Sequence, residues 1–168
     1  MDSFREYDAA KRDAVQNGLL IESKCGKGLY LIATQIAYDK FGVINPYKRA
    51  TSIEHAFYVQ LAAHILKANS ELTIKIELPV GNKGQTIDVT TTDKSGNLTA
   101  YEVTLSTSNL SSNASKLQDS AYKKIIWLCR DADTAKAVTA YFNKTAALPP
   151  DFIAKFEYEF FSKWIQKF

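Results

Sequence analysis

The stretch GQTIDVTTTDKSGNLTAYEVTLS, residues 84–106, decides the fold of this chain. Residues 85–89 and 101–105 each alternate apolar and polar side chains, as β-strands do, and the polar run between them is typical of a turn. Each strand carries one acidic residue, Asp88 in the first and Glu102 in the second. Two adjacent antiparallel strands would hold these carboxylates side by side, in a geometry suited to a hard divalent cation. The stretch therefore predicts a candidate metal site.

The segments on both sides of this stretch complete an α/β pattern. A capped helix with a broad apolar face and an alternating strand precede it, and a buried apolar strand follows it. We expect further elements as follows: helix 51–68, strand 72–78, a loop entering a helix at 107–123, strand 124–129, helix 132–143, strand 152–161 and a short basic helix at 162–168. This order predicts an α/β domain over residues 51–168, with a mixed central sheet flanked by helices.

Residues 1–45 predict a separate element made of a helix, a β-hairpin and a short helix. The helix covers residues 4–17, and the hairpin has a basic tip that contains glycine. This order resembles the back half of a winged-helix module. The resemblance implies that the helix, with Lys11 and Arg12, enters a groove of DNA and that Lys24 and Lys27 in the wing contact its backbone. The alternative is a plain packing hairpin.

The order of elements over residues 51–160, with the two acids in the second and third strands, resembles the PD-(D/E)xK nuclease superfamily, which has the restriction-endonuclease-like fold. The matching residues are Glu54 in the helix before the sheet, then Asp88 and Glu102, and then a helix that bears Lys116. The resemblance implies cleavage of phosphodiester bonds that depends on Mg²⁺ or Mn²⁺. Asp88 and Glu102 would hold the metal, with Glu54 as a third carboxylate.

The chain departs from the superfamily pattern two residues after Glu102. Lysine is expected there to stabilise developing negative charge, and the residue is Thr104. Three interpretations follow. The lysine has migrated, to Lys116 on the next helix or to Lys75 on the preceding strand; or the site binds metal and turns over poorly; or the site is inactive and the fold is a binding scaffold. We take Lys116 as the candidate catalytic replacement.

Composition excludes disorder and leaves the partner open. The 168 residues are 46% apolar, and the net charge is only +3, which permits a nucleic-acid partner without requiring one. Two distant cysteines predict no disulfide framework and a reducing, cytoplasmic compartment. No apolar run approaches the ~20 residues of a membrane-spanning helix, so we expect no membrane partner.

The resulting hypothesis is a DNA-binding protein with a nuclease-like domain. Such a pairing with a winged helix is typical of DNA-processing machines and mobile elements, an analogy at the level of the fold. The first alternative is a non-catalytic module for DNA binding or protein assembly on the same fold, and the second is an interaction domain without a nucleic-acid role. The dense aromatic residues after position 150 also predict either core packing or a surface for a homo-oligomer or larger assembly.

Overall fold

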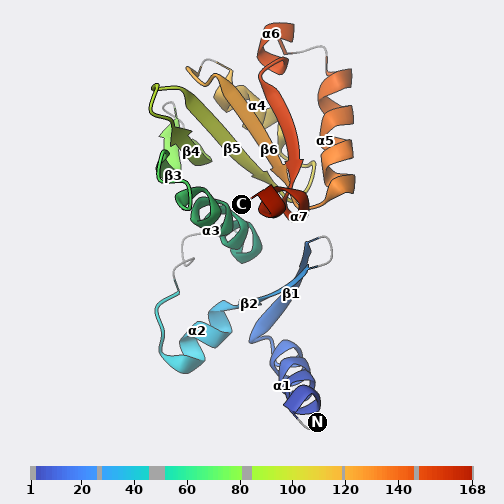
Figure 1. Cartoon of the computed structure of the whole chain (residues 1–168). Coiled ribbons are helices and arrows are strands. Elements are labelled where there is room, and N and C mark those ends of the chain that lie inside the picture. The colour runs from blue at the N-terminus through green and yellow to red at the C-terminus, as the bar shows by residue number, and fades with distance from the viewer. Residues whose placement is uncertain are drawn as a thin grey trace. The chain divides into compact units, whose positions relative to one another are not determined.

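The structure is a computed structural model that describes residues 3–25, 28–45, 52–80, 85–118, 120–145 and 148–167. The chain divides into two compact units, Met1–Phe57 and Tyr58–Phe168. The division falls inside helix α3, Ile53–Lys67, which begins in the first unit and ends in the second. The two units are described separately below (Figure 1).

The first unit contains the expected helix, hairpin and short helix. These are α1, Ser3–Gln16; an antiparallel pair of β1, Leu20–Cys25, and β2, Gly28–Ala33; and α2, Gln35–Phe41. Gly18 ends α1 with a positive φ of 67°, a conformation that glycine adopts without the steric cost of a Cβ. Thr34 caps α2 by accepting the Ala37 N–H, and its hydroxyl also donates to the Gly18 carbonyl at 2.6 Å. One threonine thus ties the start of α2 to the end of α1.

The second unit is built on a five-stranded mixed sheet in the order β3-β4-β5-β6-β7. The first three strands form an antiparallel meander, and β6 and β7 add to it in parallel. The strands are β3, Thr73–Val80; β4, Gln85–Thr92; β5, Leu98–Thr104; β6, Lys124–Cys129; and β7, Phe156–Phe160. The expected α/β architecture with a mixed sheet is therefore confirmed. Its assignment to the restriction-endonuclease-like class stays a prediction.

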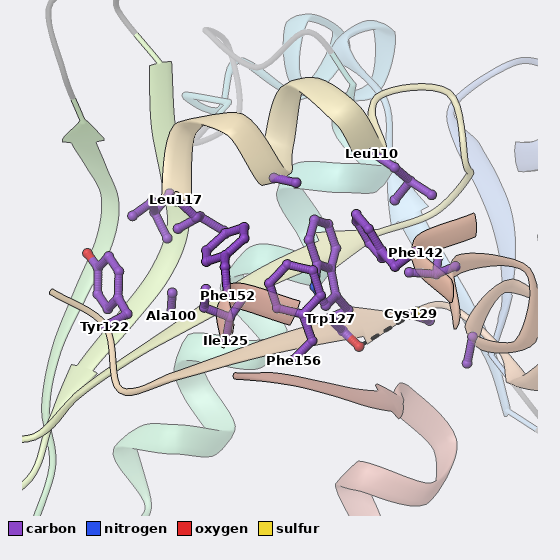
Figure 2. Close-up of a cluster of buried hydrophobic side chains, with 14 residues drawn as sticks. Ala100, Leu110, Leu117, Tyr122, Ile125, Trp127, Cys129, Phe142, Phe152 and Phe156 are labelled. Carbon is purple, nitrogen blue, oxygen red and sulfur yellow. Dashed lines mark hydrogen bonds between the residues drawn. The ribbon is translucent and has the colours of Figure 1, made fainter. Parts of the chain in front are cut away.

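One face of this sheet is covered by α4, Leu110–Leu117, and α5, Ala132–Lys144. Trp127 of β6 lies at the centre of the resulting core, with ring centroids 4.8 Å from Phe142 and 5.5 Å from Phe156 (Figure 2). On the opposite face Tyr101 of β5 packs on Trp164 of α7, Phe161–Trp164. Since both faces are covered, polar residues at alternate positions of β4 and β5 become buried as well.

The turn between β4 and β5 is held by Asp93. Its carboxylate accepts hydrogen bonds from the Ser95 and Asn97 backbone N–H groups at 2.8 and 2.9 Å and from the Asn97 side chain at 2.8 Å. These bonds, that of the Asn97 side chain first, lower the pKa of Asp93 from its ordinary value. The polar run expected as a turn is therefore confirmed, with Gly96 at a φ of 79°.

The last expected strand, 152–161, is wrong over its first residues. Residues Pro150–Ile153 form the short helix α6, and β7 begins only at Phe156. Proline fits the first turn of a helix because its φ is fixed and its missing N–H needs no partner there. Phe152 and Phe156 are therefore neighbours through a turn and pack at 4.9 Å, although their spacing also suits a strand. The chain then closes with α7 and a short 3₁₀ segment, Ile165–Lys167.

The aromatic residues near the C-terminus form part of the core. The exposed fractions of Phe152, Phe156, Phe161 and Trp164 are 5, 8, 0 and 4%. These four side chains are therefore unavailable as a surface for another copy of the chain. Phe168 lies outside the described residues. Assembly through this segment stays a prediction, and the packing of these residues does not support it.

Asp131 generates a prediction about the stability of the second unit. Its carboxylate caps α5 by accepting the Thr134 N–H and hydroxyl, each at 2.8 Å. Partial burial alone would raise the pKa of Asp131, but the bonds from Thr134 outweigh it and hold that pKa below its ordinary value. We expect Asp131→Ala to lower the free energy of unfolding by about 1 kcal/mol at neutral pH, measured by urea denaturation.

Asp131→Asn keeps an acceptor and serves as the matched control, together with Asp133→Ala, which changes an exposed side chain on the same turn. Because the folded-state pKa of Asp131 is lowered, its contribution is present above the ordinary value of 3.8 and is lost as the pH falls further. Equal stability of Asp131→Ala and the wild type at pH 7 would show that the cap does not stabilise the unit.

Candidate functional site

Asp88 and Glu102 lie on adjacent strands, close enough for the charge of Asp88 to act on Glu102. The pairing of β4 with β5 ends at Val89 and Tyr101, and the two acids are the next residue on each strand. Both are buried, with exposed fractions of 8% for Asp88 and 0% for Glu102. The alternative of two exposed carboxylates on a solvated hairpin face is therefore wrong, because both side chains are buried.

Asp88 is fixed to β5 by its own side chain. Its Oδ2 accepts the backbone N–H of Val103 at 2.8 Å. The backbone pairing of β4 with β5 stops at Val89 and Tyr101, next to the two acids. Beyond that point the Asp88 carboxylate, in place of a backbone carbonyl, accepts the Val103 N–H. This bond holds the Asp88 carboxylate beside β5, next to Glu102.

Helix α4 supplies the lysine of the site. Leu110, Ala114 and Leu117 form the buried face of this helix against the sheet. Lys116, next to Leu117, reaches the carboxylate row, where its Nζ lies 2.8 Å from Glu102 Oε2 and 2.6 Å from the Thr86 carbonyl oxygen. Its side chain is only 7% exposed. Of the two lysines considered from the sequence, Lys116 reaches Glu102, whereas Lys75 is exposed on β3.

The positive charge near Glu102 is too small to keep the pKa of its carboxyl group at the ordinary value. Burial, and then the charge of Asp88, raise the pKa of Glu102 to about 8, against the opposing attraction of Lys116. Lys116 Nζ lies 2.8 Å from Glu102 Oε2, and this contact and a hydrogen bond from the Asp88 backbone oppose the rise in pKa without cancelling it. Ionising a completely buried carboxyl group is costly, so the site favours a proton or an additional cation at Glu102.

The same row of the sheet continues through two residues that sequence reasoning missed. Glu102 pairs with Trp127 of β6, and Trp127 pairs with Tyr158 of β7. In the described part of the chain, the Trp127 Nε1 and Tyr158 hydroxyl are buried without hydrogen-bond partners, and burial raises the pKa of Tyr158 to about 12. Only the parallel register, which the sequence does not display, links these residues to the acids.

Thr104 occupies the expected lysine position without contributing a charge. It is 4% exposed, and its hydroxyl donates to the Glu102 backbone carbonyl at 3.3 Å. The hydroxyl is thus used within its own strand. The positive charge beside Glu102 comes from Lys116.

The Glu54 carboxylate accepts a hydrogen bond within the first unit. The Ser23 hydroxyl of the hairpin donates to its Oε1 at 2.6 Å. Among the residues that the structure describes, no group of three or more His, Cys, Asp or Glu side chains is arranged to hold a metal ion. The structure thus brings together Asp88, Glu102 and Lys116, and a role of Glu54 in their site stays a prediction.

The basic residues expected to contact DNA differ in how they are paired and exposed. Lys11 forms an ion pair with Glu22 at 2.8 Å, which raises the pKa of Lys11, and Arg12 Nε donates to the Asp8 carbonyl at 3.2 Å. Lys24 is exposed on β1. Lys27 lies outside the described residues, so its position in a wing stays untested.

Comparison of the chain with protein-family models, with curated proteins and with solved structures found no match. Within the part of the chain that is described, none of the helices has the length and apolar character needed to cross a membrane. The functional argument therefore rests on the geometry of Asp88, Glu102 and Lys116.

The Lys116–Glu102 pair predicts strong coupling between two substitutions. At pH 9, above the pKa of about 8, Glu102 is ionised, and Lys116→Met then removes the charge that offsets a fully buried carboxylate. We expect a loss of about 3 kcal/mol in the free energy of unfolding at that pH. Adding Glu102→Gln removes the stranded acid and restores part of this loss. Urea denaturation of the wild type, both single variants and the double variant measures the coupling. Lys136→Met, at an 81% exposed side chain, is the control.

Additive single effects, with a coupling below about 0.5 kcal/mol, would contradict a buried ion pair.

Glu102 also predicts how stability changes with pH. Its folded-state pKa of about 8 lies above its ordinary value of 4.5, so between these values the folded protein holds a proton that the unfolded chain has lost. Stability from this group is therefore present below pH 4.5 and falls as the pH rises towards 8. We expect Glu102→Gln to flatten the decline in urea midpoint between pH 5 and pH 8.5, measured with a chelator present. An unchanged decline would show that Glu102 is ionised throughout.

Proposed function

We propose that the second unit is a metal-dependent phosphodiesterase that cleaves DNA, with a PD-(D/E)xK-type site whose lysine comes from helix α4. The observation that carries the proposal is the 2.8 Å contact of Lys116 Nζ with Glu102, beside an Asp88 that is fixed to β5. Two carboxylates and a lysine are the side chains that this chemistry requires. They come from two adjacent strands and the following helix, as the resemblance implies.

The residues present fit a hard divalent cation such as Mg²⁺ or Mn²⁺. Asp88 and Glu102 offer carboxylate oxygens, the preferred ligands of these ions. A bound cation would polarise the scissile phosphate and lower the pKa of the attacking water. Asp88, at 8% exposed, is the more accessible of the two acids, so we place the approach of the metal on its side.

The protein's own groups have separate roles in this proposal. The Val103 N–H holds the Asp88 carboxylate in position, so no ordering of that side chain is needed at the moment of reaction. The Lys116 ammonium is held by the Thr86 carbonyl and by Glu102, and from there it would stabilise negative charge that develops on the phosphate. Thr104 takes no part.

DNA as the substrate is supported by the first unit. Its helix, hairpin and short helix follow the order of a winged-helix element, and Lys24 lies exposed on the hairpin. A hairpin of this kind presents cations to phosphates, and such contacts weaken as salt rises. The pairing of Lys11 with Glu22 reduces the charge available on α1, so we assign Lys24 the larger part.

The alternative is a non-catalytic DNA-binding or assembly module on the same fold. One observation favours it: Glu102 is completely buried and already paired with Lys116, as in a structural ion pair. A superfamily member that had lost activity would retain the fold and lose the lysine of the strand, where this chain has Thr104.

Cleavage assays separate the two functions. Supercoiled plasmid, linear duplex and single-stranded DNA are incubated with the whole chain and Mg²⁺ or Mn²⁺ at low salt. We expect metal-dependent cleavage by the wild type, none by Asp88→Asn, and a rate lowered about 10²–10³-fold in Lys116→Met. Glu157→Gln, which changes a half-exposed acid on β7, is the control and should cleave as the wild type does.

DNA binding is measured on the same variants across a salt series. Binding that weakens with salt and is unaffected by Asp88→Asn, without any cleavage by the wild type, would replace the nuclease by the non-catalytic module. Negligible binding at low salt would contradict both functions and leave an interaction domain.

A further inference from the structure

The second unit contains an open groove with a volume of about 360 Å³, at the end of the sheet where the parallel strands β6 and β7 begin. The residues that line it belong to the turn between β4 and β5 and to the beginnings of β6 and β7. Those that carry the argument are Asp93, Asn97, Lys123, Lys124, Lys155 and Glu157. We call this feature the lysine groove, because lysine is its commonest residue and gives it a net positive charge.

Both acids of the lysine groove have partners of their own. Glu157 forms an ion pair with Lys124, whose Nζ lies 2.7 Å from Glu157 Oε1. The Asp93 carboxylate accepts the hydrogen bonds from Ser95 and Asn97 that hold the turn between β4 and β5. The positive charge that a ligand would meet therefore comes mainly from Lys123 and Lys155.

Lys123 and Lys155 have donors left for a ligand. Lys123 is exposed, and its Nζ lies 3.4 Å from Oδ1 of Asn97, a neutral acceptor. Lys155 is partly exposed, and its ammonium group forms neither a hydrogen bond nor an ion pair with the residues that the structure describes. An ammonium group carries several N–H donors, and phosphate oxygens are strong charged acceptors for them. The groove thus fits a phosphate group.

The lining of the groove favours a phosphate backbone over an acidic protein or a small phosphorylated molecule. Ala154 is the one apolar residue among the described lining, whereas protein partners are bound through buried aromatic or apolar anchors. Small-molecule sites enclose most of their ligand, and here every described lining residue is at least partly exposed. A DNA backbone needs neither feature, because lysines contact its phosphates from one side.

We propose that the lysine groove is a DNA contact of the second unit, in which Lys123 and Lys155 bind phosphates of the backbone. This inference rests on the proposed function, which supplies DNA as the partner. Thr99, which also lines the groove, lies three residues before Glu102 on β5, roughly 10 Å along the strand. The groove is therefore separate from the candidate metal site, and its lysines contribute to affinity without taking part in the chemical step.

Fluorescence anisotropy with a labelled DNA duplex tests the proposal on the whole chain, in a chelator that prevents cleavage. Each phosphate contact contributes about 0.9 to the slope of log affinity against log salt. We therefore expect the double variant Lys123→Gln with Lys155→Gln to lower that slope by about 2 and to weaken binding about 10-fold at low salt. Urea denaturation checks that the variant keeps the stability of the wild type.

The matched control removes the same amount of charge from another part of the second unit. Lys136→Gln with Lys144→Gln changes two exposed lysines on α5, and this double variant should bind DNA nearly as the wild type does. In cleavage assays with Mg²⁺ we expect the groove variant to show a KM raised about 10-fold and an unchanged kcat, because only binding is affected. A lowered kcat would contradict a role in affinity alone.

Two results would overturn the groove as a DNA contact and leave the proposed function intact. One is wild-type affinity in the groove variant; the other is equal weakening in both double variants, which net charge alone would explain. Calorimetric titration of a deoxynucleoside monophosphate separates a third: binding that depends on Lys123 and Lys155 would assign the groove to a small phosphorylated molecule. Absence of DNA binding by the wild type at low salt would instead contradict the proposed function itself.

Discussion

The buried ion pair between Lys116 and Glu102 is the constraint on which the second unit depends. Removing a carboxylate from water is expensive, and here one ammonium group that a neighbouring helix supplies offsets part of the cost. Helix α4 must therefore dock in one position, because a shift along its axis would separate Nζ from both Glu102 and the Thr86 carbonyl. The aromatic core around Trp127 provides the apolar burial, and the ion pair determines the register of the helix on the sheet.

Much of the fold follows from the sequence because local patterns specify it. Alternation predicts the two strands, Asp93 and Gly96 predict the turn between them, and the apolar run 125–129 predicts a covered strand. The same reasoning fails at Phe152, because side chains four residues apart share a face in a helix and also in a strand, and only Pro150 indicates the helix. Alternation also does not reveal that both faces of β4 and β5 are covered, which is why burial of the acids was not expected.

Some features of the candidate site can likewise be predicted from the sequence, and others cannot. The acids are adjacent because of a short turn, so their proximity is visible in the sequence. The choice of Lys116 over Lys75 depends on where α4 docks, which is a tertiary property. The links from Glu102 to Trp127 and Tyr158 depend on parallel pairing between distant segments.

The short connection between β4 and β5 has a consequence for the order of events in folding. The carboxylates of Asp88 and Glu102 are separated by a single turn, so hairpin closure brings them together on the time scale of microseconds. Lys116 and β6 arrive later, because parallel pairing needs a crossover and contacts between distant segments form slowly. Until α4 docks, the two acids must stay hydrated. Docking of α4 then expels that water and brings the Lys116 ammonium group to Glu102 in the same step. Formation of this ion pair therefore sets the point in folding at which the interior of the second unit loses its water.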